Sequence, residues 1–293
     1  AIGAQLWAVQ PTKIASELQD KKDNGLVEVI VRLARPTATA DQSKVSVLGG
    51  VVKRSHVSVN GMTVSLPAKL VEKLSDDPNV LYITPNRKVG RMLDTAVTAV
   101  TGDIARSLGY NGDGVGVAVL DSGVTAVSDL SGTGASRVVY SESFVGGSTT
   151  DGYGHGTHVA GIIAGGGNNS MINGVSKLVG IAPKAKIINL KVLADDGSGD
   201  DSAVLAALDR VIALKNQYNI RVVNLSLGRR IYESYKSDPL CLAVEAVWKA
   251  GIVVVVAAGN DGRDNSMGTY GYGTINSPAN DPLVLTVGAM KTN

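Results

Sequence analysis

The amino-acid sequence predicts an α/β protein with a doubly wound, mainly parallel sheet, preceded by a small α+β domain. Three observations lead to this prediction. From Gly114 onward, apolar runs of strand length alternate with amphipathic segments of helix length. Residues 26–84 instead follow the order strand, helix, strand, strand, helix, strand. Glycine accounts for 35 of the 293 residues, which suits an α/β fold with many tight turns.

The composition indicates which classes of binding partner to expect. Lysine and arginine number 28 against 26 aspartates and glutamates, a net charge of +2, and no basic run occurs. We therefore expect no nucleic-acid partner. No apolar stretch reaches the roughly 20 residues that span a bilayer, so we expect no membrane partner either. Cys241 is the only cysteine, which excludes an internal disulfide and a cysteine-based zinc site, and its apolar surroundings are typical of a core residue.

The sequence begins with Ala1 rather than Met. We therefore expect a targeting peptide to have been removed and the protein to be secreted to the extracellular space.

The first part of the chain is divided into a leader at 1–24 and a small domain at 25–92. The leader is polar and carries helix-forming residues. Within the domain, Pro67 stands at a favourable first position of a helix, which Asp77 and Pro78 end. The order of elements indicates a split βαβ, ferredoxin-like unit. The expected strands cover 26–33, 51–52, 62–66 and 80–84, and the expected helix covers 67–74.

The second predicted domain covers 93–293. Residues 87–112 have weak periodicity, and we interpret them as a linker that runs into this domain. Strands separated by helices predict a parallel sheet, whose ligands bind beyond the carboxyl ends of the strands. Asp121, Ser226 and Asn260 all follow such ends. The expected strands cover 115–120, 186–193, 221–227, 252–257 and 283–287, and the expected helices cover 201–218 and 240–250.

Three residues of this domain carry groups suited to nucleophilic catalysis. Asp121 leaves a rigid strand and could orient an imidazole, while His155 opens a small-residue helix and could act as a general base. Imidazole titrates near neutral pH, as a base for a hydroxyl nucleophile requires. The side-chain amide of Asn260 could donate to a developing oxyanion.

The motifs that surround these residues resemble those of the subtilisin-like serine proteases, the subtilases. The matching motifs are Val-Leu-Asp-Ser-Gly at 119–123, Gly-His-Gly-Thr-His-Val-Ala-Gly at 154–161, Asn-Leu-Ser-Leu-Gly at 224–228, Ala-Ala-Gly-Asn at 257–260 and Val-Gly-Ala at 287–289. Residues 114–293 resemble the catalytic domain of the family, and residues 26–92 resemble its inhibitory propeptide. The order of the Asp, the His and a later Ser is the one that subtilisin uses.

The resemblance implies a secreted endopeptidase zymogen that hydrolyses peptide bonds of protein or peptide substrates. Asp121 and His155 are then members of the catalytic triad, and Asn260 is the oxyanion donor. The implied walls of the pocket before the scissile bond are Ser226, Leu227, Gly228, Ala257, Ala258 and Gly259. The implied edge segment, which pairs with the substrate backbone as an added strand, is Gly197, Ser198 and Gly199.

The resemblance also implies maturation and a metal. The propeptide would act as an intramolecular inhibitor, with self-cleavage near Met92 and Leu93. Asp129 resembles a structural calcium ligand, to which the loop at 168–169 could contribute.

The nucleophile of the family is not found in the sequence. Subtilases carry it in a Gly-Thr-Ser turn after Val-Gly-Ala, and no Gly-Thr-Ser occurs in this chain. Ser266 and Ser277 precede Val-Gly-Ala and lack the flanking pattern. We therefore expect the serine, together with the C-terminal elements of the sheet, on a segment or second polypeptide outside this sequence. A truncated sequence and a degenerate homologue that serves in binding remain as alternatives.

Functions of other classes also remain open. The rival from another class is a non-catalytic, peptide-binding or inhibitory homologue. His155 and His158 could share a metal, but no glutamate stands between them as in zinc proteases. A lipase-type hydrolase is disfavoured because no Gly-x-Ser-x-Gly elbow occurs, and a dinucleotide site because the glycines at 112–116 precede a strand.

Overall fold

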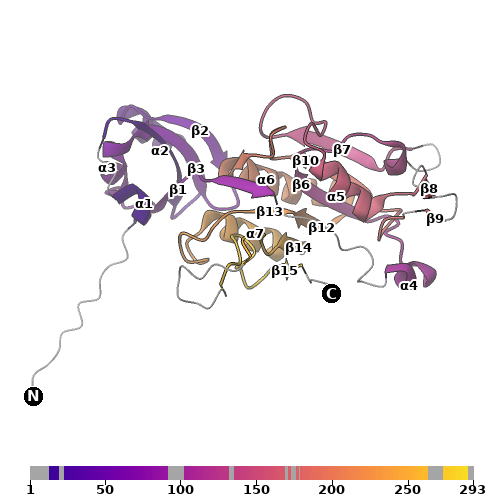
Figure 1. The fold of residues 1–293 in the computed structure, drawn as a ribbon. Helices are drawn as coiled ribbons and strands as arrows, with labels where there is room; N and C mark the ends of the chain where they lie inside the picture. The colour runs from indigo at the N-terminus through magenta and orange to yellow at the C-terminus, as the bar shows by residue number, and fades with distance from the viewer. Residues whose placement is uncertain are drawn as a thin grey trace, which may run out of the picture. The chain divides into compact units, whose positions relative to one another are not determined.

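The structure is a computed structural model, and the chain divides into two compact units, residues 1–85 and residues 86–293 (Figure 1). Each unit is described by itself. The structure describes residues 13–19, 23–91, 102–131, 135–168, 171–172, 176–177, 179–262 and 273–289.

In the described part of the first unit, an antiparallel sheet of four strands has the order β2-β3-β1-β4. Strands β1 and β2 flank β3, as in the split βαβ arrangement that the sequence predicts. The polar segment after β1 folds as helix α2, which connects it to β2. The elements are α1 (Ser16–Gln19), β1 (Leu26–Leu33), α2 (Thr39–Val47), β2 (Val51–His56), β3 (Gly61–Pro67), the 3₁₀ turn η1 (Ala68–Leu70), α3 (Val71–Ser75) and β4 (Val80–Pro85).

Alternating apolar side chains on the sheet build the core of the first unit. Val29 and Val31 of β1 and Val64 of β3 are fully buried and pack with Val45 of α2 and Leu74 of α3. Strands with period-two burial therefore place one apolar face under the helices.

One polar group lies inside this unit. His56 is 1% exposed, and its Nε2 lies 2.7 Å from the hydroxyl oxygen of Thr63. Burial, with a smaller contribution from Arg54, lowers the pKa of His56 to about 3, so the imidazole is neutral at physiological pH.

In the described part of the second unit, six strands form a sheet in the order β15-β14-β12-β6-β10-β7, and all neighbouring pairs are parallel. This confirms the predicted α/β class. The strands are β6 (Gly116–Asp121), β7 (Val138–Ser143), β10 (Lys186–Lys191), β12 (Ile220–Leu225), β14 (Val253–Ala257) and β15 (Leu285–Val287).

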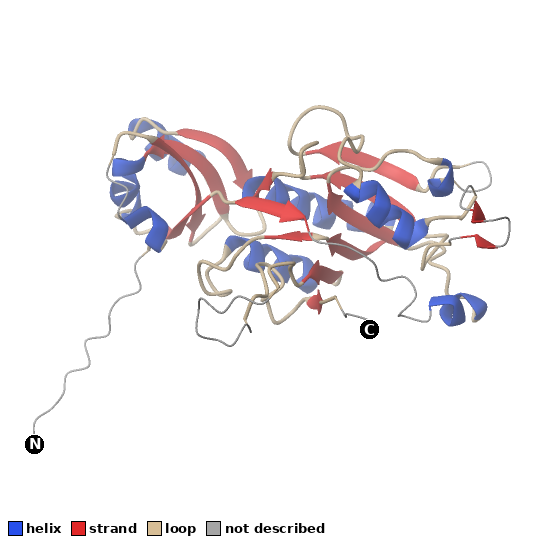
Figure 2. Ribbon diagram, viewed as in Figure 1, coloured by secondary structure: helices blue, strands red, loops and turns tan. Residues whose placement is uncertain are grey.

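Helices cover both faces of the central strand β6. Val117 and Val119 of β6 pack in one cluster with Val159 of helix α5, while Ala118 and Leu120, which point the other way, are also fully buried. Figure 2 shows the helices among the strands of this unit. The helices are α4 (Gly102–Ser107), α5 (His155–Ala164), α6 (Asp201–Tyr218) and α7 (Pro239–Lys249), with a 3₁₀ turn η2 (Ser128–Leu130). Among the described residues, no helix is both long and apolar enough to cross a bilayer.

The linker prediction for 87–112 is wrong in two places. Strand β5 (Lys88–Arg91) lies between β11 (Gly199–Asp200) and β13 (Leu227–Gly228) in a small antiparallel sheet, and residues 102–107 form α4. A strand of four residues has too few positions to show periodicity. Its pairing partners lie more than a hundred residues away in sequence, so local pattern could not reveal it. A further two-stranded ribbon pairs β8 (Met171–Ile172) with β9 (Ser176–Lys177).

Candidate active site

The end of β6 and the start of α5 bring Asp121 and His155 together. Asp121 is 1% exposed, and its Oδ1 lies 2.7 Å from Nδ1 of His155. An ionised carboxylate only accepts hydrogen bonds, so Nδ1 of His155 carries the proton and donates it. This tautomer leaves the lone pair of the neutral ring on Nε2, which is the arrangement of a general base held by a carboxylate.

Backbone groups hold this pair rigidly. The N–H of Ser122 donates to Asp121 Oδ1 over 2.7 Å, and the N–H of Gly156 donates to the hydroxyl oxygen of Ser122 over 3.0 Å. A Cβ at Gly156 would lie 2.2 Å from the carbonyl oxygen of Gly123 and 3.0 Å from the Cβ of Asp121. Only glycine lets the first turn of α5 approach β6 this closely.

Asp151, which the sequence analysis did not identify as a site residue, also holds the Asp121–His155 pair in place. Its Oδ1 accepts the N–H of Gly154 at 2.7 Å and lies 2.8 Å from the Ser122 hydroxyl, while Oδ2 accepts the N–H of Thr157 at 2.8 Å. Burial raises the pKa of Asp151, but these hydrogen bonds outweigh it and leave the pKa below its ordinary value. The available signal was an aspartate shortly before a helix start, where its charge favours the first-turn amides.

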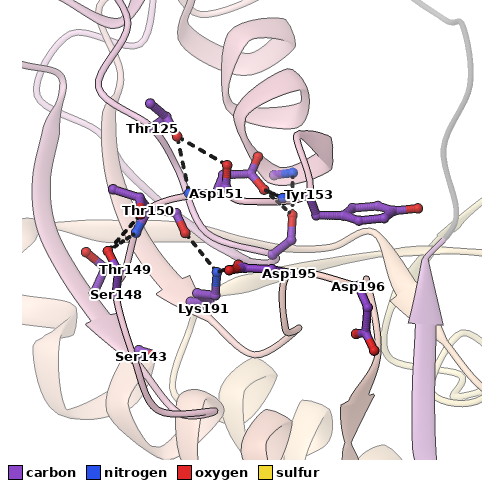
Figure 3. A network of polar contacts seen from close by, with 12 residues as sticks. Thr125, Ser143, Ser148, Thr149, Thr150, Asp151, Tyr153, Lys191, Asp195 and Asp196 are labelled. Carbon is purple, nitrogen blue, oxygen red and sulfur yellow. Dashed lines mark hydrogen bonds and ion pairs between the residues drawn. The ribbon is translucent and has the colours of Figure 1, made fainter.

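Two contacts hold the loop that carries Asp151 (Figure 3). The backbone N–H of Asp151 donates to the hydroxyl oxygen of Thr125, in the segment after β6, over 3.2 Å. Lys191, the residue of β10 beside Asp121, is 3% exposed and donates through Nζ to the carbonyl of Thr150 at 2.8 Å and to Asp195 at 2.5 Å. A buried ammonium that is fully engaged in this way fixes the loop and, through Asp151, the start of α5.

The predicted edge segment and one predicted pocket wall meet at β5. Gly199 of β11 pairs with Val89, and Leu227 and Gly228 of β13 pair with Arg91 and Gly90. Segments 197–199 and 226–228 thus lie on opposite sides of one extended backbone.

The remaining members of these segments are placed as follows by the structure. Gly197 has a φ of 80°, and Ser198 donates through its hydroxyl to Asp196 over 2.6 Å in a tight turn. Ser226 is 1% exposed and lies 2.9 Å from the side-chain nitrogen of Asn224, which donates to it. Neither serine has the setting of a nucleophile beside His155.

The second predicted wall follows β14. Ala257 is the last residue of that strand, Ala258 donates its N–H to Val287 over 2.8 Å, and Gly259 has a φ of 124°. Asn260 is exposed and lies beyond the carboxyl end of β14, at the same edge of the parallel sheet as Asp121. Its role as an oxyanion donor stays a prediction.

Three further predictions concern maturation and calcium. Met92 and Leu93 lie outside the described residues. Asp129 lies in η2, where its carbonyl accepts the N–H of Gly166, and Asn168 donates its amide to the carbonyls of Ser128 and Ser131. Across the described part of the chain, no group of three or more carboxylate, histidine or cysteine side chains is found that could hold a metal ion. The calcium site therefore stays a prediction.

Other candidate nucleophiles are buried or outside the described residues. Ser277 is fully buried and donates its hydroxyl to Asp238 over 2.8 Å. Cys241 is fully buried in α7, and burial raises the pKa of its thiol, which keeps the thiol neutral. Ser266 is not among the described residues.

Comparison with known proteins shows what the chain is similar to. The model of the subtilase family matches residues 112–293. Subtilisin E of Bacillus subtilis is 33% identical over 253 residues, which cover 85% of this chain and 61% of subtilisin E. The serine protease AprX of the same species is 36% identical over 240 residues, or 78% of this chain and 50% of AprX. This chain therefore spans about three fifths or less of the length of these relatives.

One solved structure supports the fold. Fervidolysin from Fervidobacterium pennivorans, described as a keratinolytic enzyme related to subtilisin, superposes with a TM-score of 0.65 at 21% sequence identity. The match covers 93% of this chain and 44% of fervidolysin. At this identity the likeness concerns the fold alone.

Proposed function

The chain belongs to the subtilase family, and from this premise we propose that it is part of the zymogen of a secreted serine endopeptidase. Subtilases are serine endopeptidases, and the relatives described above are named as subtilisin and serine protease. In this proposal the nucleophilic serine comes from a segment or chain outside residues 1–293, because no Gly-Thr-Ser turn occurs within them. We call this chain together with the serine-bearing segment the complete assembly.

His155 would perform the proton transfers, and Asp121 would orient it. Nε2 of His155 takes the proton of the serine hydroxyl as its oxygen attacks the peptide carbonyl, and then returns it to the leaving amine. Asp121, 2.7 Å from Nδ1, keeps the tautomer and stabilises the imidazolium that forms. Asn260 would donate to the oxyanion, a contribution of about 2.7–4 kcal/mol in comparable sites.

The position of β5 is the observation that carries the zymogen proposal. An extended segment of the chain itself, Lys88–Arg91, forms antiparallel ladders with the edge segment and with the pocket wall. A peptide substrate adds a strand to exposed sheet edges in this manner. We therefore propose that residues 25–92 act as a propeptide whose tail occupies the substrate position, with cleavage after Met92.

Two finer features belong to this proposal. Secretion is part of it on the strength of the family resemblance. Subtilases commonly bind structural calcium, and Asp129 is the proposed ligand in this chain.

Covalent labelling of the complete assembly with a fluorophosphonate tests the proposed function. We expect one labelled serine in the wild type and a large loss of labelling in His155→Ala, because the hydroxyl then has no base. His158→Ala, three residues further along the same helix, is the control and should label at a rate close to the wild type. The rival candidate, a non-catalytic peptide-binding homologue, predicts no labelled serine in any of the three proteins.

A further inference from the structure

The side chain of Arg87, which immediately precedes β5, lies in a pocket of its own. Its Nη1 donates to Oε1 of Glu233 over 2.6 Å, and its guanidinium carbon lies 4.7 Å from the centre of the Tyr232 ring. The side chains of Arg87 and Glu233 are only 6% and 4% exposed. The backbone is held as well, because the N–H of Asp201 donates to the carbonyl of Arg87 over 2.8 Å.

The charges behind this pocket favour a cation in it. Arg229 lies between Asp201 and Asp238, with its Nε 3.1 Å from both carboxylate oxygens of Asp201 and its Nη2 2.8 Å from Asp238. All three of these residues are buried. Two carboxylates thus face this single guanidinium, and the charge of Arg87, which lowers the pKa of Asp201, compensates part of the excess.

The residue types in the pocket select arginine over lysine. A planar guanidinium can stack on the Tyr232 ring while it donates a hydrogen bond to Glu233, and both contacts occur here. An ammonium is a point charge that is more strongly hydrated and gains less from the aromatic face.

The strand register gives the pocket a place along a substrate. Gly199 pairs with Val89, and Leu227 pairs with Arg91, so Arg87 stands immediately before the paired residues of β5. If cleavage follows Met92, Arg87 is the sixth residue before the scissile bond.

We propose that Tyr232, Glu233 and the neighbouring Asp201 form an extended subsite that binds an arginine side chain six residues before the cleaved bond of protein substrates. The inference rests on the proposed function and deepens it, because it assigns a substrate preference to a surface remote from the Asp121–His155 pair. The chain's own Arg87 then acts as a substrate mimic in this subsite.

Hydrolysis of matched peptides by the mature complete assembly tests this subsite. The parent peptide has the sequence of residues 86–95, and its variants carry Lys, Gln or Glu in place of Arg87. We expect kcat/KM for cleavage after methionine to be at least about tenfold higher for the Arg peptide than for the Gln peptide. The Gln peptide loses a hydrogen bond between charged groups, and such a loss has an effect of this size. Lys should lie between these two and Glu below them. Glu233→Gln should bring the Arg to Gln ratio close to one, whereas Glu245→Gln, which removes a surface carboxylate paired with Lys249, should keep it.

The outcomes separate the two levels of the proposal. Equal kcat/KM for the Arg and Gln peptides overturns the subsite, as does an Arg preference that survives in Glu233→Gln. The comparison among peptides uses the wild-type protein, so the test stands even where Glu233→Gln does not fold. Failure to hydrolyse any of the peptides contradicts the proposed function itself, and the subsite with it.

Discussion

At the scale of single residues, the arrangement around His155 depends on how closely α5 approaches β6. The Asp121–His155 contact was predicted from two sequence motifs, since an aspartate at a strand end and a histidine at a helix start are visible locally. The supports were not predicted. Gly156, Ser122 and Asp151 act through contacts between segments about thirty residues apart, which only the folded chain reveals.

Gly156→Ala should therefore lower activity without touching a catalytic group. The added Cβ would meet the Gly123 carbonyl at 2.2 Å, and the first turn of α5 must move away from Asp121. A displacement of about 1 Å can cost about a hundredfold in rate, so we expect a fall of that order in kcat/KM of the complete assembly.

Gly161→Ala in the same helix is the matched control, because its Cβ would meet nothing within 4 Å. It should leave kcat/KM unchanged and raise helix stability slightly. Equal activity of the two variants would show that the close approach is unimportant.

His56 gives the first unit a specific pH dependence. Its pKa in the folded chain is about 3, below the value near 6.5 of an exposed histidine, so the unfolded state binds a proton first as the pH falls. The contribution of neutral His56 to the free energy of unfolding is fully present above about pH 6.5. Below that pH it declines by about 1.4 kcal/mol per pH unit, or about 2 kcal/mol by pH 5. Arg35 lowers the pKa of Asp41, and Lys44 lowers the pKa of Asp77. The contributions of these two carboxylates to stability are therefore lost only under more acidic conditions.

The measurement is urea unfolding of the chain at pH 7 and pH 5, followed by hydrogen exchange of residues 51–67. The variant His56→Gln keeps a side chain that can hydrogen-bond to Thr63 but does not titrate in this range. It should lose the difference between the two pH values. A wild-type stability that is the same at both pH values contradicts the buried, neutral state of His56.

At the scale of elements, one buried ion cluster joins two helices. Asp201 is the first residue of α6, and Asp238 caps α7 by accepting the N–H of Leu240. Arg229, which follows β13, bridges both carboxylates. Burial is the largest influence on the pKa of Asp201 and raises it, and the nearby Asp238 raises it further. Arg229 and Arg87 lower it, and the resulting pKa is about 6. The starts of both helices are thus coupled to the segment that follows β13.

Arg229→Met should accordingly destabilise the second unit strongly. Removal of one partner leaves two carboxylates in the interior, for which we expect a loss of about 3–5 kcal/mol in the free energy of unfolding. Arg210→Met removes a partly exposed pair with Glu142 and should cost about 1 kcal/mol or less. Denaturant unfolding of both variants measures the difference, and similar losses would contradict the role given to the cluster.

Elements with strong local patterns were predicted well, and elements defined by distant partners were not. The buried strand β6 and the capped helix α6 follow from apolar runs and periodicity. Strand β7 lies at the edge of the sheet and is polar and only half-buried, so its sequence has no clear signal. Strand β5 pairs with two segments more than a hundred residues away in sequence, which is why local pattern does not distinguish its residues from a linker.

At the scale of the whole molecule, the central claim is that the chain contains a catalytic base, the carboxylate that orients it, and a cleft filled by its own residues 88–91. The sheet of the second unit follows from alternation of strands and helices, and the family from five motifs in order. The sequence could not show that residues 88–91 lie between segments 199–200 and 227–228, because that is a property of the folded backbone.

Determination of the new N-terminus after maturation of the complete assembly tests this claim most directly. The family resemblance places the proposed cleavage near Met92-Leu93, so mass spectrometry of the mature species should find an N-terminus close to Leu93, and His155→Ala should remain uncleaved. A mature terminus far from residue 93, or the same cleavage in His155→Ala, would contradict the account.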